Sequence, residues 1–183
     1  MRVIAGKYRH IVLDALEGDH TRPTKDMVKE ALFSSLGSFD GSETFLDLFG
    51  GSGGMGIEAC SRGAKRVVIN DGFREAYEII KKNVSKVQAP IAVYNLDYTD
   101  CIKSLANQKF DYIFLDPPYK FNEFDKIFSL FNEYGLLKDD SIVIFETDKH
   151  SKIADCYCDF KEYKTKKYGI SVLHYYNKEK EGL

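Results

Sequence analysis

From residue 44 onward, short apolar segments alternate with segments of helical character, and this alternation constrains the fold more than any other feature. Strands are predicted at residues 44–49, 66–70, 91–95, 112–115 and 141–146, and helices at 55–62, 73–84, 99–105 and 123–134. Strands that alternate with helices indicate a parallel sheet covered on both faces. Residues 161–168 and 170–176 alternate β-forming side chains around Gly169, which predicts a closing antiparallel hairpin. The predicted fold class is therefore α/β, with a mostly parallel, doubly wound sheet.

The first 40 residues precede this alternating pattern and predict a small extension. Residues 2–5 and 9–13 predict two short strands that turn at Gly6-Lys7. A helix is predicted from Thr24, as its N-cap, to Leu36, where Gly37 ends it. The length of 183 residues matches one domain. We therefore expect a single domain, in which residues 1–40 form an N-terminal hairpin and helix extension and residues 41–183 form the functional core.

The loop after the first predicted strand is rich in glycine. Gly51, Gly53 and Gly56 form a G-x-G-x-x-G pattern between a predicted strand and a predicted helix. Glycine allows a tight turn and a close approach of the backbone to a ligand, and the amides of the following helix point at whatever binds. Asp71 ends the next strand, 20 residues after Gly51, where a carboxylate can accept both hydroxyls of a ribose. Together these residues predict a nucleoside-bearing cofactor.

Two further acids bear on which cofactor this is. Asp47 ends the first strand, where a carboxylate would repel the phosphates of a dinucleotide but attract the ammonium group of S-adenosylmethionine (SAM). Asp97 follows the third strand and is placed to accept a hydrogen bond from an adenine amino group, although a helix cap explains it equally well. We therefore expect SAM, with a nicotinamide cofactor as the alternative.

The fourth strand is followed by the sequence Asp116-Pro117-Pro118-Tyr119. The two prolines stiffen the loop and remove two backbone donors, so that nearby carbonyl groups point outward as acceptors. The amino group of a nucleobase is a poor nucleophile because its lone pair is delocalised into the ring. The Asp116 carboxylate and the Pro117 carbonyl could accept both of its hydrogens, while Tyr119 offers a flat face for an unstacked base. The loop therefore predicts methyl transfer to an amino group.

With these motifs, the sequence resembles the SAM-dependent amino-methyltransferases that carry a D/N-P-P-Y motif, and more narrowly the bacterial RsmD family. The resemblance rests on Met1-Arg2-Val3-Ile4-Ala5-Gly6-Lys7-Tyr8-Arg9, on Thr21-Arg22-Pro23-Thr24, on Leu46-Asp47-Leu48-Phe49 with Gly51-Ser52-Gly53, on Ser61-Arg62-Gly63-Ala64 and on the Asp116 loop. It implies a Rossmann-like class I methyltransferase fold. It also implies methylation of N2 of a guanine in 16S ribosomal RNA, in an assembled or partly assembled small subunit. Gly50 departs from the family, which usually has alanine there.

The motifs and the resemblance together assign the site. The expected cofactor-binding residues are Arg22, Pro23, Thr24, Asp47, Phe49, Gly51, Ser52, Gly53, Asp71 and Asp97. The expected catalytic residues are Asp116, Pro117, Pro118 and Tyr119. The resemblance implies that residues 21–24 close the methionine end of the cofactor site, where Arg22 could fork onto a carboxylate. Phosphates of the RNA are expected to contact Arg2, Lys7, Arg9 and Lys120, together with the lysines of 161–180.

Several other functions stay open on these residues. A DNA adenine or cytosine amino-methyltransferase would use the same catalytic loop, and a protein-glutamine methyltransferase usually carries asparagine in place of Asp116. A catalytically inactive SAM-binding module is a further alternative. Glu146, at the end of the fifth strand, could contact the edge of a base, although a structural carboxylate explains it better.

Composition adds a few negative expectations. The four cysteines and four histidines show no zinc-ligand spacing, so we expect no metal. No apolar run approaches the ~20 residues that span a bilayer, and the first residues contain no signal-peptide pattern. A net charge of -2 gives no indication of a nucleic-acid partner, although basic residues gather at 1–10 and 161–180. We expect a cytoplasmic monomer.

Overall fold

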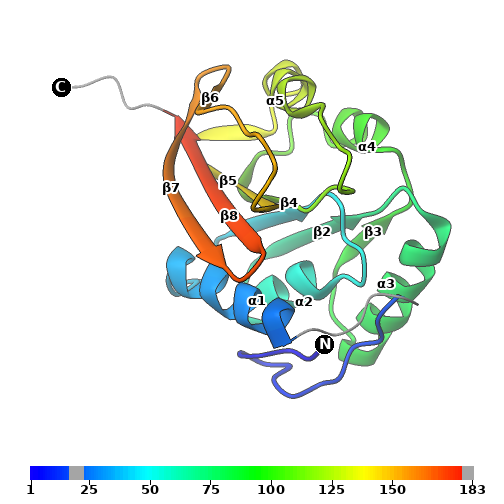
Figure 1. Ribbon diagram of the computed structural model, residues 1–183. Helices are drawn as coiled ribbons and strands as arrows, with labels where there is room; N and C mark the ends of the chain where they lie inside the picture. Colours follow the sequence, from blue (N-terminus) through cyan, green and yellow to red (C-terminus); the bar gives the residue numbers. More distant parts are fainter. Residues whose placement is uncertain (17–22, 179–183) are drawn as a thin grey trace.

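The computed structural model describes residues 1–16 and 23–178, with Pro23 and Thr24 described by their backbone alone. Within these residues, eight strands form one sheet in the order β3-β2-β1-β4-β5-β8-β7-β6 (Figure 1). The parallel part consists of β1 (Thr44–Asp47), β2 (Arg66–Asn70), β3 (Ala92–Tyr94), β4 (Phe110–Leu115) and β5 (Leu137–Asp148). The antiparallel part consists of β6 (Cys156–Tyr157), β7 (Phe160–Tyr168) and β8 (Ser171–Lys178). The predicted α/β fold class is confirmed.

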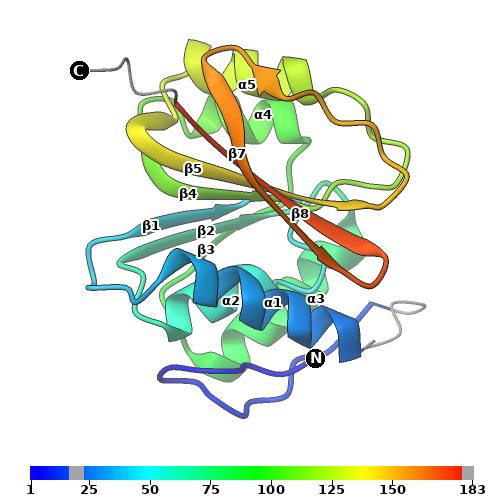
Figure 2. The ribbon, with the colours of Figure 1, turned by 60° about the vertical axis from the view of Figure 1, so that its left-hand side comes forward.

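Helices cover both faces of this sheet (Figure 2). They are α1 (Pro23–Leu36), α2 (Gly54–Ser61), α3 (Arg74–Val87), α4 (Tyr98–Ser104) and α5 (Phe124–Glu133). The helices α4 and α5 bury apolar side chains such as Ile102 and Phe128 against one face. The helices α1, α2 and α3 bury Leu32, Ile57 and Ile80 against the other. Each face therefore has its own apolar core, as a doubly wound sheet requires.

The predicted closing hairpin is present as β7 and β8, but the end of the sheet is more extensive than expected. Strand β5 was predicted at residues 141–146 and runs from Leu137 to Asp148. At its carboxyl end, the added residues Thr147 and Asp148 pair with Val172 and Ser171 of β8. At its amino end, Leu137 pairs with Phe110 of β4. The two-residue strand β6 was not predicted, because a pairing so short leaves no periodic pattern in the sequence.

The N-terminal segments pair as a hairpin, but over less backbone than predicted. Arg2 and Val12 form a single antiparallel bridge, in place of strands at 2–5 and 9–13. The reason lies in α2, whose Glu58 carboxylate accepts hydrogen bonds from the amides of Ile4 (2.8 Å) and Ala5 (3.0 Å). Those amides are therefore lost to a strand ladder, and the segment is bound to the helix instead.

Helix α1 begins at Pro23, one residue before the predicted N-cap. Thr24 therefore lies inside the first turn, and the prediction that it caps the helix is wrong. A proline suits the first helical position because the amide it lacks would have no partner there. None of the helices in the described part of the chain is long and apolar enough to cross a bilayer.

The order of the strands reverses between β1 and β4, which lie side by side at the centre of the sheet. From β1 the chain moves to β2 and β3 on one side, and from β4 it moves to β5 on the other. The loops that leave the carboxyl ends of β1 and β4 therefore diverge and open a crevice between them. Ligands of doubly wound sheets bind at this point.

Candidate functional site

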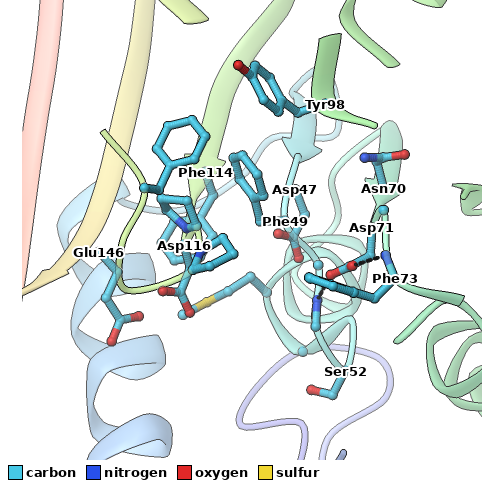
Figure 3. Close-up of a pocket in the computed structure, with 18 of the residues that line it drawn as sticks. Asp47, Phe49, Ser52, Asn70, Asp71, Phe73, Tyr98, Phe114, Asp116 and Glu146 are labelled. Atoms are coloured by element: carbon cyan, nitrogen blue, oxygen red, sulfur yellow. Dashed lines mark hydrogen bonds between the residues drawn. The ribbon is translucent and has the colours of Figure 1, made fainter. Parts of the chain in front are cut away.

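A cavity of about 970 Å3 opens at the carboxyl ends of the central strands (Figure 3). The predicted site residues that line it are Asp47, Phe49, Gly51, Ser52, Asp71, Asp97, Asp116, Pro117, Pro118 and Tyr119. Gly53 lies at the N-cap of α2 and does not line the cavity. Arg22 is outside the described residues, as are the side chains of Pro23 and Thr24. The next residues of α1 that line the cavity are Lys25 and Lys29.

The glycine loop makes a tight turn between β1 and α2. Gly53 donates its amide hydrogen to the carbonyl of Gly50 at 2.7 Å, and both Gly51 and Gly53 have positive φ. A Cβ atom on Gly51 would meet nothing within 4 Å, so its place is open space beside the loop. A Cβ atom on Gly50 would instead lie 2.4 Å from Cγ2 of Ile69, which explains why alanine is absent there.

Asp71 is fixed at the end of β2 by the loops on either side of it. One carboxylate oxygen accepts the amide hydrogen of Gly51, and the other accepts that of Phe73, both at 2.9 Å. The neighbouring Asn70 joins the three loops, since its amide donates to the carbonyls of Leu48 (3.2 Å) and Leu96 (3.0 Å). Sequence analysis missed Asn70, although its place at a strand end beside Asp71 was a usable signal.

Asp47 is the most deeply buried acid of the cavity, with 1% of its surface exposed. One carboxylate oxygen accepts the amide hydrogen of Gly56 at 3.1 Å. The other has no hydrogen-bond partner among the described residues, although it belongs to a side chain that lines the cavity. Burial raises the pKa of Asp47 to about 7. A buried carboxylate with a spare oxygen is suited to a cationic group of a ligand.

Asp97 is the N-cap of α4, which is one of the two roles predicted for it. Its carboxylate accepts hydrogen bonds from the backbone amide (2.9 Å) and the hydroxyl (2.7 Å) of Thr99. These bonds hold the pKa of Asp97 below its ordinary value. Asp97 also lines the cavity, so the capping role leaves it available to a ligand.

The loop after β4 lies between two cavities. A second cavity, of about 660 Å3, shares Asp116, Pro117, Pro118, Tyr119, Phe121 and Glu146 with the first. The Tyr119 side chain is 77% exposed, so it can meet a ligand without any rearrangement of the core. Phe121 packs edge-to-face against Phe49, with ring centroids 5.4 Å apart, and thereby joins this loop to the glycine loop. Figure 3 shows Glu146 beside Asp116.

The predicted RNA contacts outside the lysines of 161–180 fall into two groups. Lys120 lines the second cavity. Arg2, Lys7 and Arg9 are exposed on the N-terminal segment and line neither of these two cavities. Lys7 instead lies over the ring of Tyr8, 5.2 Å from its centroid. No group of three or more histidine, cysteine or acidic side chains in the described part of the chain is arranged to hold a metal ion.

A buried lysine that sequence analysis missed connects the N-terminal segment to this cavity. Lys29 of α1 is 1% exposed, and its ammonium group lies 3.5 Å from Glu58 and donates to the carbonyl of Arg2 at 2.5 Å. Burial lowers the pKa of Lys29. The available signal was a lysine placed among the apolar residues Val28 and Leu32 of the predicted helix.

The strand order, the glycine loop after β1 and the Asp116 loop after β4 together define a Rossmann-like methyltransferase. A family model described as "Conserved hypothetical protein 95" matches residues 1–177. The "Ribosomal RNA small subunit methyltransferase D" of Haemophilus influenzae is 37% identical over 81% of this chain and 79% of its own. YlbH of Bacillus subtilis is 34% identical over 97% of this chain and 99% of its own.

Among solved structures, yhhF of Escherichia coli matches with a TM-score of 0.84 at 25% identity and covers 98% of both chains. The sequence comparison and the structural comparison therefore both cover nearly the whole chain. The chain belongs to the family of the matched model, which is the RsmD family of ribosomal RNA methyltransferases.

Proposed function

We propose that this chain methylates the exocyclic N2 amino group of a guanine in 16S ribosomal RNA, within an assembled or partly assembled small subunit. The observation that carries the proposal is the Asp116-Pro117-Pro118-Tyr119 loop, which lines both cavities. A loop shared by two cavities can contact both the donor and the acceptor of a group transfer. The small-subunit methyltransferase named in Haemophilus influenzae supports ribosomal RNA as the acceptor.

The residues of the first cavity fit SAM. The spare oxygen of Asp47 suits the ammonium group of its methionine end, and the open space beside Gly51 lets a ligand approach the backbone. Each oxygen of Asp71 keeps a lone pair for a ribose hydroxyl while it accepts one backbone hydrogen bond. When bound, SAM supplies an electrophilic methyl group. Asp47, Gly51 and Asp71 would hold it in place.

The second cavity would hold the base, with its amino group toward the shared loop. The Asp116 carboxylate and the Pro117 carbonyl accept the two amino hydrogens and so leave the nitrogen lone pair directed away from the ring system. The exposed ring of Tyr119 supports the base by stacking. Asp116 also offers a carboxylate for the proton that the amino group releases when the methyl group passes from the sulfur of SAM to the nitrogen.

The test is transfer of labelled methyl from SAM, offered in parallel to unmodified small subunits, naked 16S RNA and DNA. We expect N2-methylguanine in ribosomal RNA. In Asp116→Ala the rate should fall about 100-fold or more, as when one preorganised polar partner of a reacting group is removed. The matched control is Asp100→Ala, which removes an exposed acid of α4 outside both cavities.

Each arm can contradict the proposal. Label found in DNA alone would overturn the RNA substrate. No label in any acceptor, with SAM still bound, would mean an inactive binding module. Full activity in Asp116→Ala would remove the role given to the carboxylate. Loss of activity in Asp100→Ala to the same extent would show that the assay reports on folding.

A further inference from the structure

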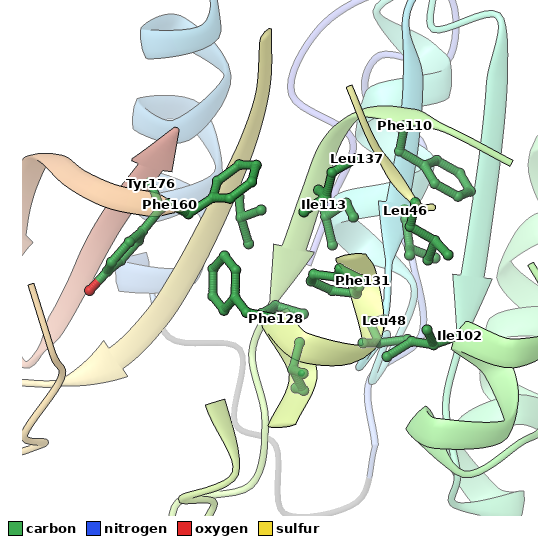
Figure 4. Packing of buried hydrophobic residues seen from close by; sticks show 14 of the residues in the cluster. Leu46, Leu48, Ile102, Phe110, Ile113, Phe128, Phe131, Leu137, Phe160 and Tyr176 are labelled. Carbon is green, nitrogen blue, oxygen red and sulfur yellow. The ribbon is translucent and has the colours of Figure 1, made fainter. Parts of the chain in front are cut away.

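Three polar side chains form a hydrogen-bonded row across the antiparallel end of the sheet and reach the wall of the second cavity. Thr147 of β5 lines the cavity, and its hydroxyl lies 3.1 Å from Nε2 of His174 on β8. Nδ1 of His174 lies 2.6 Å from the carboxylate of Glu162 on β7. The row lies in the same face of the sheet as Phe160 and Tyr176, whose apolar packing Figure 4 shows.

The row is not needed to hold the three strands together, because backbone hydrogen bonds already do this. Strand β5 pairs with β8 across Thr147, and β7 pairs with β8 across Glu162. The side chains of His174 and Glu162 are only 14% and 22% exposed, so these polar groups have given up most of their water. Their burial costs free energy that the hydrogen bonds of the row only offset. The arrangement therefore calls for another explanation.

The chemistry of the row determines which way each hydrogen points. A carboxylate only accepts, so Nδ1 of His174 must carry the hydrogen that faces Glu162. In the neutral ring Nε2 then has a lone pair and accepts the hydrogen of the Thr147 hydroxyl. The Glu162 carboxylate is itself held, since the same oxygen accepts the Thr165 hydroxyl at 2.7 Å. The Thr147 oxygen is thus left with lone pairs, which make it an acceptor at the cavity wall.

We propose that Thr147, positioned by His174 and Glu162, accepts an N–H group from the edge of the target base and thereby selects guanine over adenine. The inference rests on the proposed function. Guanine carries a hydrogen on N1 beside its 2-amino group, whereas the N1 atom of adenine is itself an acceptor. An acceptor in the cavity wall can bind the N1 hydrogen of guanine, whereas it would face the lone pair of N1 in adenine. His174 and Glu162 touch no substrate and act as positioning residues.

The first test measures kcat/KM for methylation of unmodified small subunits. Thr147→Val keeps the shape of the side chain and removes the hydroxyl, so we expect a fall of about 10-fold, the size of one neutral hydrogen bond. Thr147→Ser keeps the hydroxyl and should stay within about 3-fold of wild type. The control is Ser85→Ala, which removes an exposed hydroxyl of α3 outside both cavities, and it should also stay within about 3-fold. Affinity for SAM should be unchanged throughout.

The second test uses guanosine and adenosine 5′-monophosphate as probes, with nitrogen NMR of the His174 ring as the readout. We expect the guanine nucleotide to shift the Nε2 resonance, the adenine nucleotide to leave it in place, and Thr147→Val to abolish the response. In Glu162→Gln the amide can face Nδ1 as a donor or an acceptor, so the preference between the two nucleotides should weaken. This readout reports hydrogen bonding at His174 and would not follow from a purely structural role.

The outcomes separate this inference from the proposed function. Wild-type activity on small subunits with full kcat/KM in Thr147→Val would overturn the role of Thr147 and leave the proposed function intact. Equal responses of His174 to both nucleotides would overturn the selectivity. Should wild type fail to methylate ribosomal RNA, the proposed function falls, and the NMR comparison still decides whether Thr147 recognises guanine.

Discussion

Replacing Asp47 with asparagine should stabilise the folded protein at neutral pH while it weakens the binding of SAM. The carboxylate is buried and its pKa is raised from 3.8 to about 7. One pKa unit corresponds to about 1.4 kcal/mol, so ionised Asp47 costs the folded state about 4 kcal/mol relative to the unfolded chain. Asparagine keeps an oxygen for the amide of Gly56 and carries no charge.

The sign of the effect follows from proton binding. Between pH 3.8 and about 7 the folded protein holds the Asp47 proton more tightly than the unfolded chain does. The contribution of Asp47 to stability is therefore complete below pH 3.8 and is lost as the pH rises to about 7. The variant lacks this titration, so its stability relative to wild type should rise by about 3 kcal/mol from about pH 5 to about pH 8. Urea unfolding at the two pH values measures that difference.

Binding of SAM should show the opposite trend, because its ammonium group requires the ionised carboxylate. We expect wild-type affinity to rise about 10-fold from about pH 6 to about pH 8 and then to level off, while Asp47→Asn binds weakly at every pH. Calorimetric titration with SAM gives both curves, and Asp100→Asn serves as the control. A stability difference that does not change with pH would refute the raised pKa. Equal affinities for SAM would refute the contact with the ammonium group.

Three further predictions concern packing, a buried charge and the exposed tyrosine. Gly50→Ala places a methyl group 2.4 Å from Cγ2 of Ile69 and should cost about 1–3 kcal/mol in urea unfolding; a cost near zero would mean that Ile69 moves freely. Glu58→Gln leaves Lys29 buried without its anion and should cost about 3–5 kcal/mol, part of which Lys29→Met in the same chain should recover; a double variant no more stable than the single one would contradict the pairing. Tyr119→Ala should leave stability within about 0.5 kcal/mol, because the side chain is 77% exposed, and should lower kcat/KM about 10-fold or more; unchanged activity would remove the stacking role.

The fold class could be predicted because it depends on local patterns that repeat. Strands and helices place their apolar residues at different sequence spacings, and each segment from residue 44 onward shows one of these spacings. The glycine pattern after β1 could also be predicted from local sequence, since a tight turn requires residues without a side chain at fixed spacing. Placing Asp47, Asp71 and Asp116 at one edge then followed from the rule that parallel strands end together.

What only the tertiary structure decided are the contacts between residues far apart in the chain. The amides of Ile4 and Ala5 donate hydrogen bonds to Glu58 rather than to a second strand. The local sequence does not indicate this partner, because Glu58 lies more than 50 residues away in the chain. Burial is equally non-local: Asp47 has a raised pKa because the assembled sheet and glycine loop exclude water from it. The row from Glu162 through His174 to Thr147 exists only because β7, β8 and β5 lie side by side in the sheet. Sequence patterns reflect the local conformational preference of each segment, whereas hydrogen-bond partners and desolvation depend on which segments pack together.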